Sequence, residues 1–546
     1  MSRHPTLFIM PTFLALAGNT AARGFSVADG IVTAIIFFVL AASVYIVRSY
    51  RKGLRHSPRE LWLLYGYKFI ECVAYGAVNP VLTLWLTHDC GLQDKPASYY
   101  IAVYSVIFSA MNVVAGAFVD TAGIRRMTLV SVAMLIVSRL LMGCVTNPAL
   151  VFVVGFIPMA LGFAIVSPVV SIGVKRFTTN DGSPMGFALF YMIMNIGFAA
   201  GALVFDVFRK VFVTRNAEGR IVDEARGLEI LGLHFSTYQL LFLFGTLATL
   251  VSLGVVLLMR EGVEVNEAGE TVVKKREAAT KPSVAGVKDT LASTGRMIVA
   301  VARERFFWFF LTFAGLLMFV RSVYNHFHYT FPKYGIRVLG EGAPIGSVYG
   351  VLNPVLIVFL VPLIAALTKN VKSYTLIVTG SMLSAGALFL AIIPPHHFEW
   401  MTHTPFGEVI FVRWLGIAPD AAALATNPPA PMYWPLIFFI TVFTIGEAIW
   451  SPRLYQFTTE IAPKGKEATY LSLAVLPTFA SKVFVGWMSG ELLDRYTPID
   501  HVTKAVLPHP HQYMVWVWIG VSAAVTPIGL LVFKKAFDRE AAATAK

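Results

Sequence analysis

The chain has 546 residues, of which 56% are hydrophobic and 14% charged, and its mean hydropathy is +0.68. Soluble globular proteins carry roughly 25% charged residues, so this composition excludes a soluble protein and indicates a membrane protein. The net charge of +13 would also suit a nucleic-acid-binding protein, but the basic residues lie in short loops between apolar runs, as membrane topology requires.

Apolar runs of about 20 residues, each long enough to cross a bilayer, recur along the chain. The spans that we predict, in chain order, are 31–48, 61–86, 98–118, 127–145, 149–172, 185–207, 236–259, 306–330, 346–368, 373–394, 434–457, 467–488 and 513–533. The span at 31–48 is extra, and those from residue 61 onward form a set of twelve.

Basic residues predict the orientation of these spans. One set of alternate loops carries most of them, including Arg125, Arg126 and several in the segment 260–305. Loops rich in Lys and Arg face the cytoplasm, so we expect a multi-pass protein of the inner (plasma) membrane. The expected partner of the protein is then the lipid bilayer, and no nucleic acid is expected to bind.

The spans suggest the following division of the chain. Residues 1–25 are either a cleaved signal peptide or an uncleaved interfacial leader. Residues 26–60 hold the extra span and a basic loop, and 61–259 and 306–546 are two six-span halves. The segment 260–305 is a polar cytoplasmic linker, whose later part could form an amphipathic helix on the membrane surface.

The sequence offers little that suits an enzyme. Cys72, Cys90 and Cys144 are isolated, so no zinc-type spacing exists; Cys90 and Cys144 both fall near the predicted outer face, where a disulfide is conceivable but not fixed. No nucleotide-binding glycine loop or placed nucleophile–base pair appears. We therefore predict a non-enzyme that holds neither metal nor cofactor.

Glu447 is a carboxylate within an apolar run that is long enough to span a bilayer. A charged side chain there is costly and marks a functional site by default, because it must face a cavity, a partner or a ligand. The alternative is an internal salt bridge to Arg321 or Arg453.

A loop motif, GAFVDTAGIRR at 116–126, is similar to the G-x-x-x-D-x-x-G-x-[RK]-[RK] loop of major facilitator superfamily transporters. The resemblance implies an all-α fold of two six-helix halves, here with one extra N-terminal transmembrane helix. It also implies that Asp120, Gly123, Arg125 and Arg126 set the conformational balance. A plain basic loop is the alternative.

Three further stretches resemble the proton-dependent oligopeptide transporters of that superfamily: Phe190–Gly197, Leu352–Pro362 and Gly446–Pro452. In that family two asparagines and a glutamate line the central cavity and hold the amino end of the peptide. The resemblance carries these roles to Asn195, Asn353 and Glu447. For each asparagine, a structural hydrogen bond between helices is the alternative.

The resemblance fails at the expected carboxylate end. The family's E-x-x-E-R motif is matched by Lys68, Glu71 and Cys72, and Ser167 stands where the family has a lysine, so two cations are missing. Lys68, Glu71 and Tyr75 share one helix face. We expect Lys68 and Glu71 to form an ion pair, which either changes during proton coupling or is a static bridge.

A second polar cluster lies in the span 306–330. Arg321, Tyr324, Asn325 and His328 share a face, with His328 expected near the outer mouth. Arg321 could hold a substrate carboxylate or could pair with Glu447, and Tyr75 and Tyr324 are candidate contacts for the solute. Other polar residues within the spans are expected to be structural: Arg139, Lys482 and Asp206.

Taken together, these features predict a secondary active transporter that moves a small polar solute by alternating access. We expect a proton-coupled carrier of a peptide-like or amine-containing solute, with Glu71, Lys68 and Glu447 in coupling and a monomeric functional unit. The alternatives are a transport-inactive receptor or scaffold of the same fold, and a facilitator for a non-peptide solute.

Overall fold

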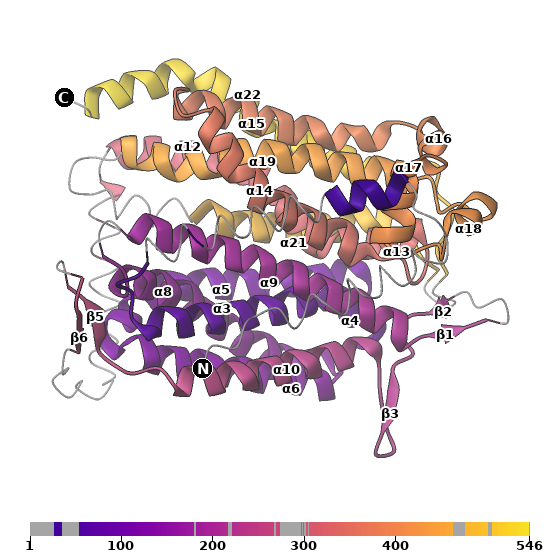
Figure 1. The fold of residues 1–546 in the computed structure, drawn as a ribbon, viewed down its shortest axis with the longest axis horizontal. Helices are drawn as coiled ribbons and strands as arrows, with labels where there is room; N and C mark the ends of the chain where they lie inside the picture. The colour runs from indigo at the N-terminus through magenta and orange to yellow at the C-terminus, as the bar shows by residue number, and fades with distance from the viewer. Residues whose placement is uncertain are drawn as a thin grey trace. The chain divides into compact units, whose positions relative to one another are not determined.

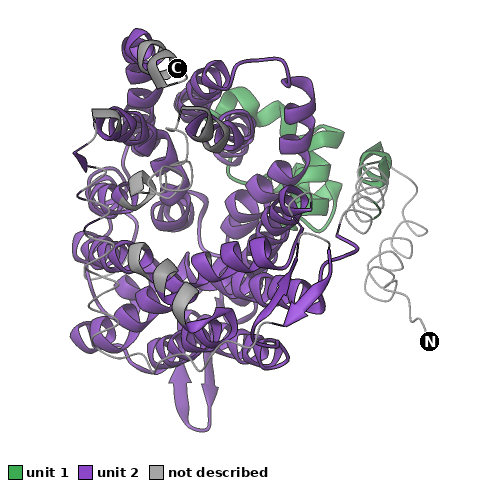
Figure 2. Ribbon diagram, turned by 90° about the vertical axis from the view of Figure 1, so that its left-hand side faces the viewer, with its two compact units in different colours: residues 1–52, 395–431 green, residues 53–394, 432–546 purple. Residues whose placement is uncertain are grey.

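A computed structural model describes residues 27–34, 48, 54–179, 182–216, 221–266, 269–273, 296, 299, 302–303, 305–461, 476–500 and 505–544. The leader at 1–25, most of the extra span at 31–48 and most of the segment 260–305, including its amphipathic part, lie outside these residues. The chain divides into two compact units (Figure 2), one of residues 1–52 and 395–431 and the other of 53–394 and 432–546.

The first half of the larger unit is built from long apolar helices. They are α3 (Arg59–Val78), α4 (Val81–His88), α5 (Asp94–Ala122), α6 (Ile124–Cys144), α7 (Pro148–Val151), η1 (Phe152–Phe156), α8 (Ile157–Arg176), α9 (Ser183–Val211) and α10 (Thr237–Leu257). Pro80 separates α3 from α4, because proline lacks the N–H that would continue the helix. Gly123 separates α5 from α6 with a φ of +98°, which favours glycine.

The second half of the same unit repeats this pattern. Its helices are α12 (Arg305–Tyr329), α13 (Phe331–Leu339), η2 (Gly346–Val351), α14 (Leu352–Leu367), α15 (Ser373–Ala387), η3 (Leu388–Ile392), α19 (Tyr433–Ile461), α21 (Leu476–Tyr496) and α22 (Met514–Thr544). An apolar core of this half joins α12, α15, α19 and α22 around Phe313, Trp450 and Leu530.

Three short antiparallel hairpins extend from the helix ends. They are β1 (Thr214–Arg215) with β2 (Ile221–Asp223), β3 (Leu228–Ile230) with β4 (Leu233–Phe235), and β5 (Val263–Val265) with β6 (Thr271–Val273). Figure 1 shows β1 and β2 near α13 at one end of the helices and β5 and β6 at the other. By the predicted orientation, the α13 end is the outer end.

The smaller unit contains η4 (Pro395–Phe398), α16 (Glu399–Thr402), α17 (Pro405–Glu408), η5 (Val409–Trp414) and α18 (Ala421–Thr426), together with helical residues 27–34. Arg413 joins its two segments: its guanidinium lies 2.8 Å from the Asp29 carboxylate and 3.1 Å from that of Glu408.

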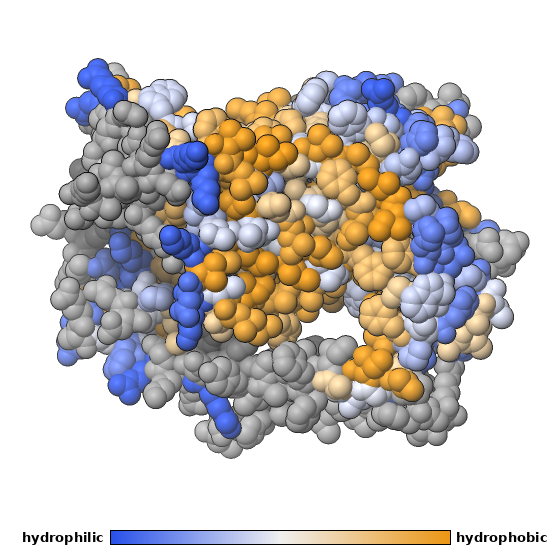
Figure 3. All heavy atoms as spheres, turned by 90° about the horizontal axis from the view of Figure 1, so that it is seen from above, coloured by the Kyte–Doolittle hydropathy of each residue, from blue (hydrophilic) through white to orange (hydrophobic). Residues whose placement is uncertain are grey.

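Ten helices in the described part of the chain are long and apolar enough to cross a membrane. Each matches one of the predicted spans, and α5 and α21 also cover the predicted spans 98–118 and 467–488, the latter in part. Figure 3 shows a broad apolar surface with hydrophilic residues gathered toward both ends. A multi-pass membrane protein is therefore confirmed.

The two halves pack against each other through α5 with α21 and through α9 with α14 and η2. These contacts need glycine, because a Cβ on Gly346 would lie 2.5 Å from the Ala202 carbonyl oxygen, and one on Gly486 would lie 2.8 Å from the Ala102 Cβ. Small residues allow helix backbones to approach closely in membranes.

Candidate functional site

Glu447 of α19 lies against the start of α14. The Asn353 amide donates a 2.8 Å hydrogen bond to a Glu447 carboxylate oxygen and a 2.9 Å bond to the Thr444 hydroxyl. Asn353 is the second residue of α14, directly after the π-helical segment η2, and such segments are frequent at functional sites. The structure thus brings together two of the three residues that the family resemblance singled out.

Arg321 and Tyr324 of α12 belong to the surroundings of this carboxylate. The positive charge of Arg321 acts electrostatically on Glu447, and Glu447 in turn acts on Tyr324. Arg453, the other predicted partner, donates to the Thr368 hydroxyl at 3.1 Å. The described hydrogen bond of Glu447 is therefore made to the neutral amide of Asn353.

Asn195, the third residue, is buried in α9. Its amide nitrogen donates to the backbone oxygen of Tyr191, 2.8 Å away in the same helix. This bond uses the amide nitrogen and not the amide oxygen of Asn195. A role of Asn195 in solute binding stays a prediction.

The expected ion pair between Lys68 and Glu71 is not formed. Glu71 of α3 instead accepts from Arg139 of α6, with nitrogen–oxygen distances of 3.1 and 3.4 Å, and both side chains are almost fully buried. Arg139 also bonds to the Thr249 hydroxyl of α10. The cation that pairs with Glu71 thus comes from a different helix. Lys68 instead lines the cavity that is described next.

A cavity of about 170 Å³ lies beside this pair. It is lined from both halves by Lys68, Glu71, Cys72, Tyr75, Tyr104, Phe108, Phe163, Val166, Phe198 and Lys482. The Lys482 ammonium of α21 lies 4.2 Å from the Phe108 ring centroid, and that of Lys68 lies 5.7 Å from the Phe190 ring centroid. The cavity therefore combines two cations with aromatic walls.

An aromatic cluster around His328 contacts this cavity through Tyr75. His328 of α12 lies 4.9 Å from Tyr324, 6.0 Å from Tyr349 and 6.1 Å from Tyr75 of the opposite half, measured between ring centroids. A smaller cavity of about 20 Å³ touches His328, Tyr324, Tyr349 and Asn353. His328 thus packs between the halves.

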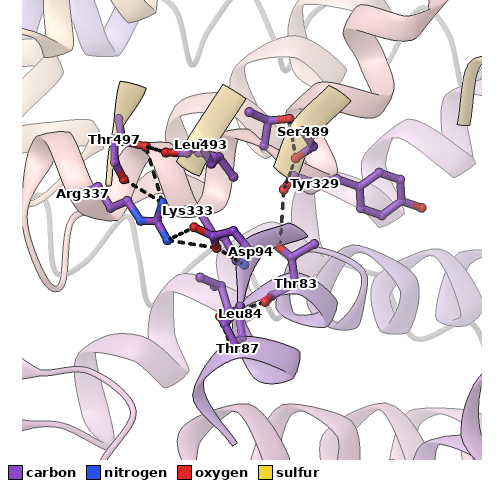
Figure 4. Close-up of polar contacts among 11 residues, drawn as sticks. Thr83, Leu84, Thr87, Asp94, Tyr329, Lys333, Arg337, Ser489, Leu493 and Thr497 are labelled. Carbon is purple, nitrogen blue, oxygen red and sulfur yellow. Dashed lines mark hydrogen bonds and ion pairs between the residues drawn. The ribbon is translucent and has the colours of Figure 1, made fainter. Parts of the chain in front are cut away.

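An ion cluster joins the two halves at the outer end (Figure 4). The Asp94 carboxylate at the start of α5 lies 2.7 Å from the Lys333 ammonium and 2.7 Å from the Arg337 guanidinium, both on α13. Arg337 also donates to the Thr497 backbone oxygen at 2.8 Å. These three charged side chains, Asp94, Lys333 and Arg337, are all buried and form what we call the outer cluster.

Burial and charge act in opposite directions on the acid of the outer cluster. Burial raises the pKa of Asp94, but the charges of Lys333 and Arg337 outweigh it and hold that pKa below its ordinary value. Burial lowers the pKa of Lys333 to about 8, although the charge of Asp94 raises it. Asp94 is therefore ionised throughout the physiological range.

A second group of contacts closes the same end. Asp206 of α9 accepts from the backbone nitrogens of Gly346 (2.8 Å) and Ser347 (2.6 Å) at the start of η2. An acid at a helix N-terminus satisfies N–H groups that have no partner within the helix. Arg209 pairs with Glu224 and donates to the Ala343 oxygen at 3.0 Å. Together with the outer cluster, these bonds hold the outer ends of the halves in contact.

Comparisons with known proteins agree with this architecture. The family model described as Major Facilitator Superfamily matches residues 64–481. The chain belongs to the Major Facilitator Superfamily. No curated protein matches the sequence.

Solved structures of this superfamily share the fold at low sequence identity. A POT family transporter in complex with 5-aminolevulinic acid is 16% identical with a TM-score of 0.60, covering 87% of this chain and 96% of that one. The peptide transporter POT in complex with sulfate is 17% identical with a TM-score of 0.57, covering 88% and 96%. A D-xylose–proton symporter is 13% identical with a TM-score of 0.54, covering 86% and 97%. The chain thus shares the fold of these transporters.

The superfamily loop at 116–126 lies at the opposite end from the outer cluster. Gly123 forms the turn between α5 and α6, and the Arg125 guanidinium donates to the Leu257 carbonyl oxygen at the end of α10, 3.4 Å away. The side chain of Asp120 lies outside the described residues, as does that of Ser167. The gating role of Asp120, Gly123, Arg125 and Arg126 stays a prediction.

Sequence reasoning missed the outer cluster. Lys333 and Arg337 are four residues apart just after a predicted span, and this spacing was the available signal. The disulfide considered between Cys90 and Cys144 is not formed, because both thiols are free.

Proposed function

We propose that this protein is a proton-coupled secondary transporter that moves a small, peptide-like or amine-containing solute by alternating access. The observation that carries the proposal is Glu447, a carboxylate in an apolar helix whose described hydrogen bond is made to the neutral amide of Asn353. An amide leaves the negative charge in place. Beside the charge of Arg321, which acts on it from α12, a proton or a cationic solute group can neutralise it.

The two carboxylates, Glu71 and the half-buried Glu447, differ in how easily they exchange a proton. Protonating Glu71 breaks its bond to the buried guanidinium of Arg139, and breaking a buried pair costs about 3–5 kcal/mol. Protonating Glu447 removes a charge from an apolar helix and keeps the hydrogen bond from Asn353, because a protonated carboxyl still accepts. We therefore assign the coupling proton to Glu447 and a structural role to the Glu71–Arg139 pair.

The contacts between the halves support alternating access. The outer cluster and the Asp206 bonds to η2 join 61–259 to 306–546 at the outer end, so these six-span halves are the proposed moving bodies. The solute site would open outward when these contacts separate. The proposal also includes a cytoplasmic linker at 260–305, an inner (plasma) membrane location and a monomeric functional unit.

A proteoliposome assay tests the proposal. Uptake of a panel of dipeptides, tripeptides and primary amines is measured with and without an imposed inward proton gradient. We expect gradient-driven accumulation in the wild type, and its loss with retained solute exchange in Glu447→Gln. The matched control is Glu408→Gln, a carboxylate of the smaller unit paired with Arg413. Accumulation that is equal in Glu447→Gln and wild type would refute the role of Glu447, and flux without gradient dependence would indicate a facilitator.

A further inference from the structure

The two lysines of the 170 Å³ cavity come from opposite halves of the transporter. Lys68 lies in the middle of α3 and Lys482 lies in α21, and both line the same space. Of the described residues that line it, Glu71 alone is acidic, and Arg139 neutralises it. The cavity therefore has an excess of two positive charges.

The contacts around these lysines do not offset the cost of holding their charges in the membrane. Neither lysine forms an ion pair with any residue that the structure describes; Lys482 lies over Phe108 and Lys68 over Phe190. A cation over an aromatic ring gains roughly 0.5–2 kcal/mol, whereas desolvating an ammonium costs several kcal/mol. Both side chains are half-buried and open to the cavity. An anion bound in the cavity would therefore offset the part of the desolvation cost that the aromatic contacts leave.

We propose that Lys68 and Lys482 bind the carboxylate of the transported solute between them, one cation from each half. The inference deepens the proposed function and rests on it. It gives Lys482, which the sequence suggested to be structural, a role in substrate specificity. It also supplies two cations in place of those that the sequence lacks at Cys72 and Ser167.

The walls of the cavity define the rest of the solute. Tyr75 and Phe163 pack edge to face at 5.3 Å, and Tyr104, Phe108 and Phe198 complete an aromatic lining. Such rings suit an apolar or aromatic body next to the carboxylate. Tyr75 also contacts His328, which packs against Tyr324, and the charge of Glu447 acts on Tyr324. The inference therefore includes a zwitterionic solute with its carboxylate at the lysines and its amine toward Glu447.

The peptide-like solute of the proposed function supplies the anion as a carboxylate. Two ammonium groups act as point charges and can also hold a phosphate, so the test includes a phosphate probe. An anion between them would also cancel their mutual repulsion and draw α3 and α21 together. Solute binding would then favour closure of the halves around it, because a ligand shifts a conformational equilibrium by its difference in affinity for the two states.

Matched ligand pairs test the assignment by binding to the purified full-length protein. The probes are alanyl-phenylalanine and its C-terminal amide, and 3-phenylpropionate and its amide, with phenyl phosphate as a non-carboxylate anion. We expect at least one carboxylate to bind more tightly than its amide. Lys68→Gln and Lys482→Gln should each weaken carboxylate binding by about tenfold or more, because each removes one charged hydrogen-bond donor.

The controls separate a specific effect from misfolding. Lys482→Arg keeps the charge and should retain carboxylate binding, and amide affinity should be the same in all variants. Lys95→Gln removes an exposed lysine of the outer end, paired with Glu491 and Asp494, and should leave both affinities unchanged.

Each remaining outcome decides the question. Carboxylates that bind no better than their amides, or binding by phenyl phosphate alone, would overturn the carboxylate assignment. Uptake of the amides into proteoliposomes with no preference for the carboxylates would also overturn the carboxylate assignment, but it would support the proposed transport function. Carboxylate-dependent binding that needs both lysines, without flux of any probe, would support the site and overturn the transport function.

Discussion

Replacing Asp94 by asparagine tests whether the outer cluster controls opening of the outer end. The Asp94→Asn substitution keeps the size of the side chain but leaves the Lys333 and Arg337 charges buried without a counter-ion. Since these cations belong to the opposite half, the substitution perturbs the contact between the halves. It should therefore change the balance between closed and open forms more than it changes the fold of either half.

The expected size of this effect follows from the burial of the cluster. Asp94 is 5% exposed and Lys333 3% exposed, and removing one partner of a buried pair costs about 3–5 kcal/mol. In the outward-open form water would solvate both cations, so the cost falls on the closed form. A shift of about 3 kcal/mol changes the ratio of the two forms by about a hundredfold.

Cysteine labelling from outside reports this shift. Ser98 of α5 is 3% exposed, and its hydroxyl would lie 2.9 Å from a Cβ placed on Gly490 of α21, so it is covered only while the halves are closed. In a background without the native cysteines, Ser98→Cys should react slowly with a membrane-impermeant maleimide. Adding Asp94→Asn should raise the rate by about tenfold or more, up to the limit set by full exposure.

Two controls make this prediction refutable. Lys95→Gln breaks an exposed ion pair at the same end and should change the labelling rate little. Neutralising Lys333 and Arg337 together with Asp94 should restore slow labelling, because no buried charge then remains. An Asp94→Asn rate equal to that of Lys95→Gln, in protein that is still monodisperse, would show that the outer cluster does not bias the equilibrium.

Three further predictions use the same structure. Glu71→Gln and Arg139→Met should each lower the free energy of unfolding of the purified protein by about 3 kcal/mol or more, because each leaves one buried charge without its partner. The double variant should recover much of that loss, because no unpaired charge remains. Losses that simply add in the double variant would contradict a buried pair. Glu447→Gln should make solute exchange, measured by counterflow, insensitive to pH, because the variant has no carboxylate at this position to bind the coupling proton. A retained pH profile would place the coupling proton elsewhere. Desolvation of its carboxyl, and next the charge of Glu224, raise the pKa of Glu341 to about 7, so the closed outer end gains stability below about pH 7 and loses it as the pH rises through that value. The labelling rate of Ser98→Cys, divided at each pH by that of a fully exposed reference cysteine to remove the titration of the thiol itself, should fall on acidification by less than about tenfold, since much of the Glu341 side chain is exposed. Glu341→Gln should abolish that normalised response.

Much of the fold could be predicted because long apolar runs have few alternatives in a bilayer. As far as the structure describes them, the predicted spans from residue 61 onward coincide with helices of the larger unit, and the superfamily loop lies at the turn between α5 and α6. The helices of 395–431 were not predicted, because they are short and lie in a segment without a spanning apolar run. The break at Pro80 also appeared only in the structure, since the apolar pattern continues across it.

The candidate site was harder to predict because its contacts join residues far apart in sequence. Helical spacing suggested that Lys68 would pair with Glu71, yet Arg139 takes that place from a helix 68 residues away. Asn353 and Glu447 were found together only through their family resemblance, since neither spacing nor composition relates residues 94 positions apart. The outer cluster similarly depends on how α13 packs against α5, which apolar periodicity does not determine.

The location of charge in the two halves suggests how the transport cycle is balanced. The outer cluster and the bonds that Arg209 and Glu224 make to the Ala343 oxygen and the Gly342 nitrogen stabilise the outward-closed form, so something must offset them when the outer end opens. Shifting a two-state equilibrium from 1:99 to 99:1 requires about 5.5 kcal/mol of differential binding, which one surface ion pair does not supply. A solute carboxylate held between Lys68 and Lys482, together with a proton on Glu447, would act on three half-buried charges at once. The cluster should accordingly be strong enough to close the empty transporter but weak enough for a bound solute to reverse it.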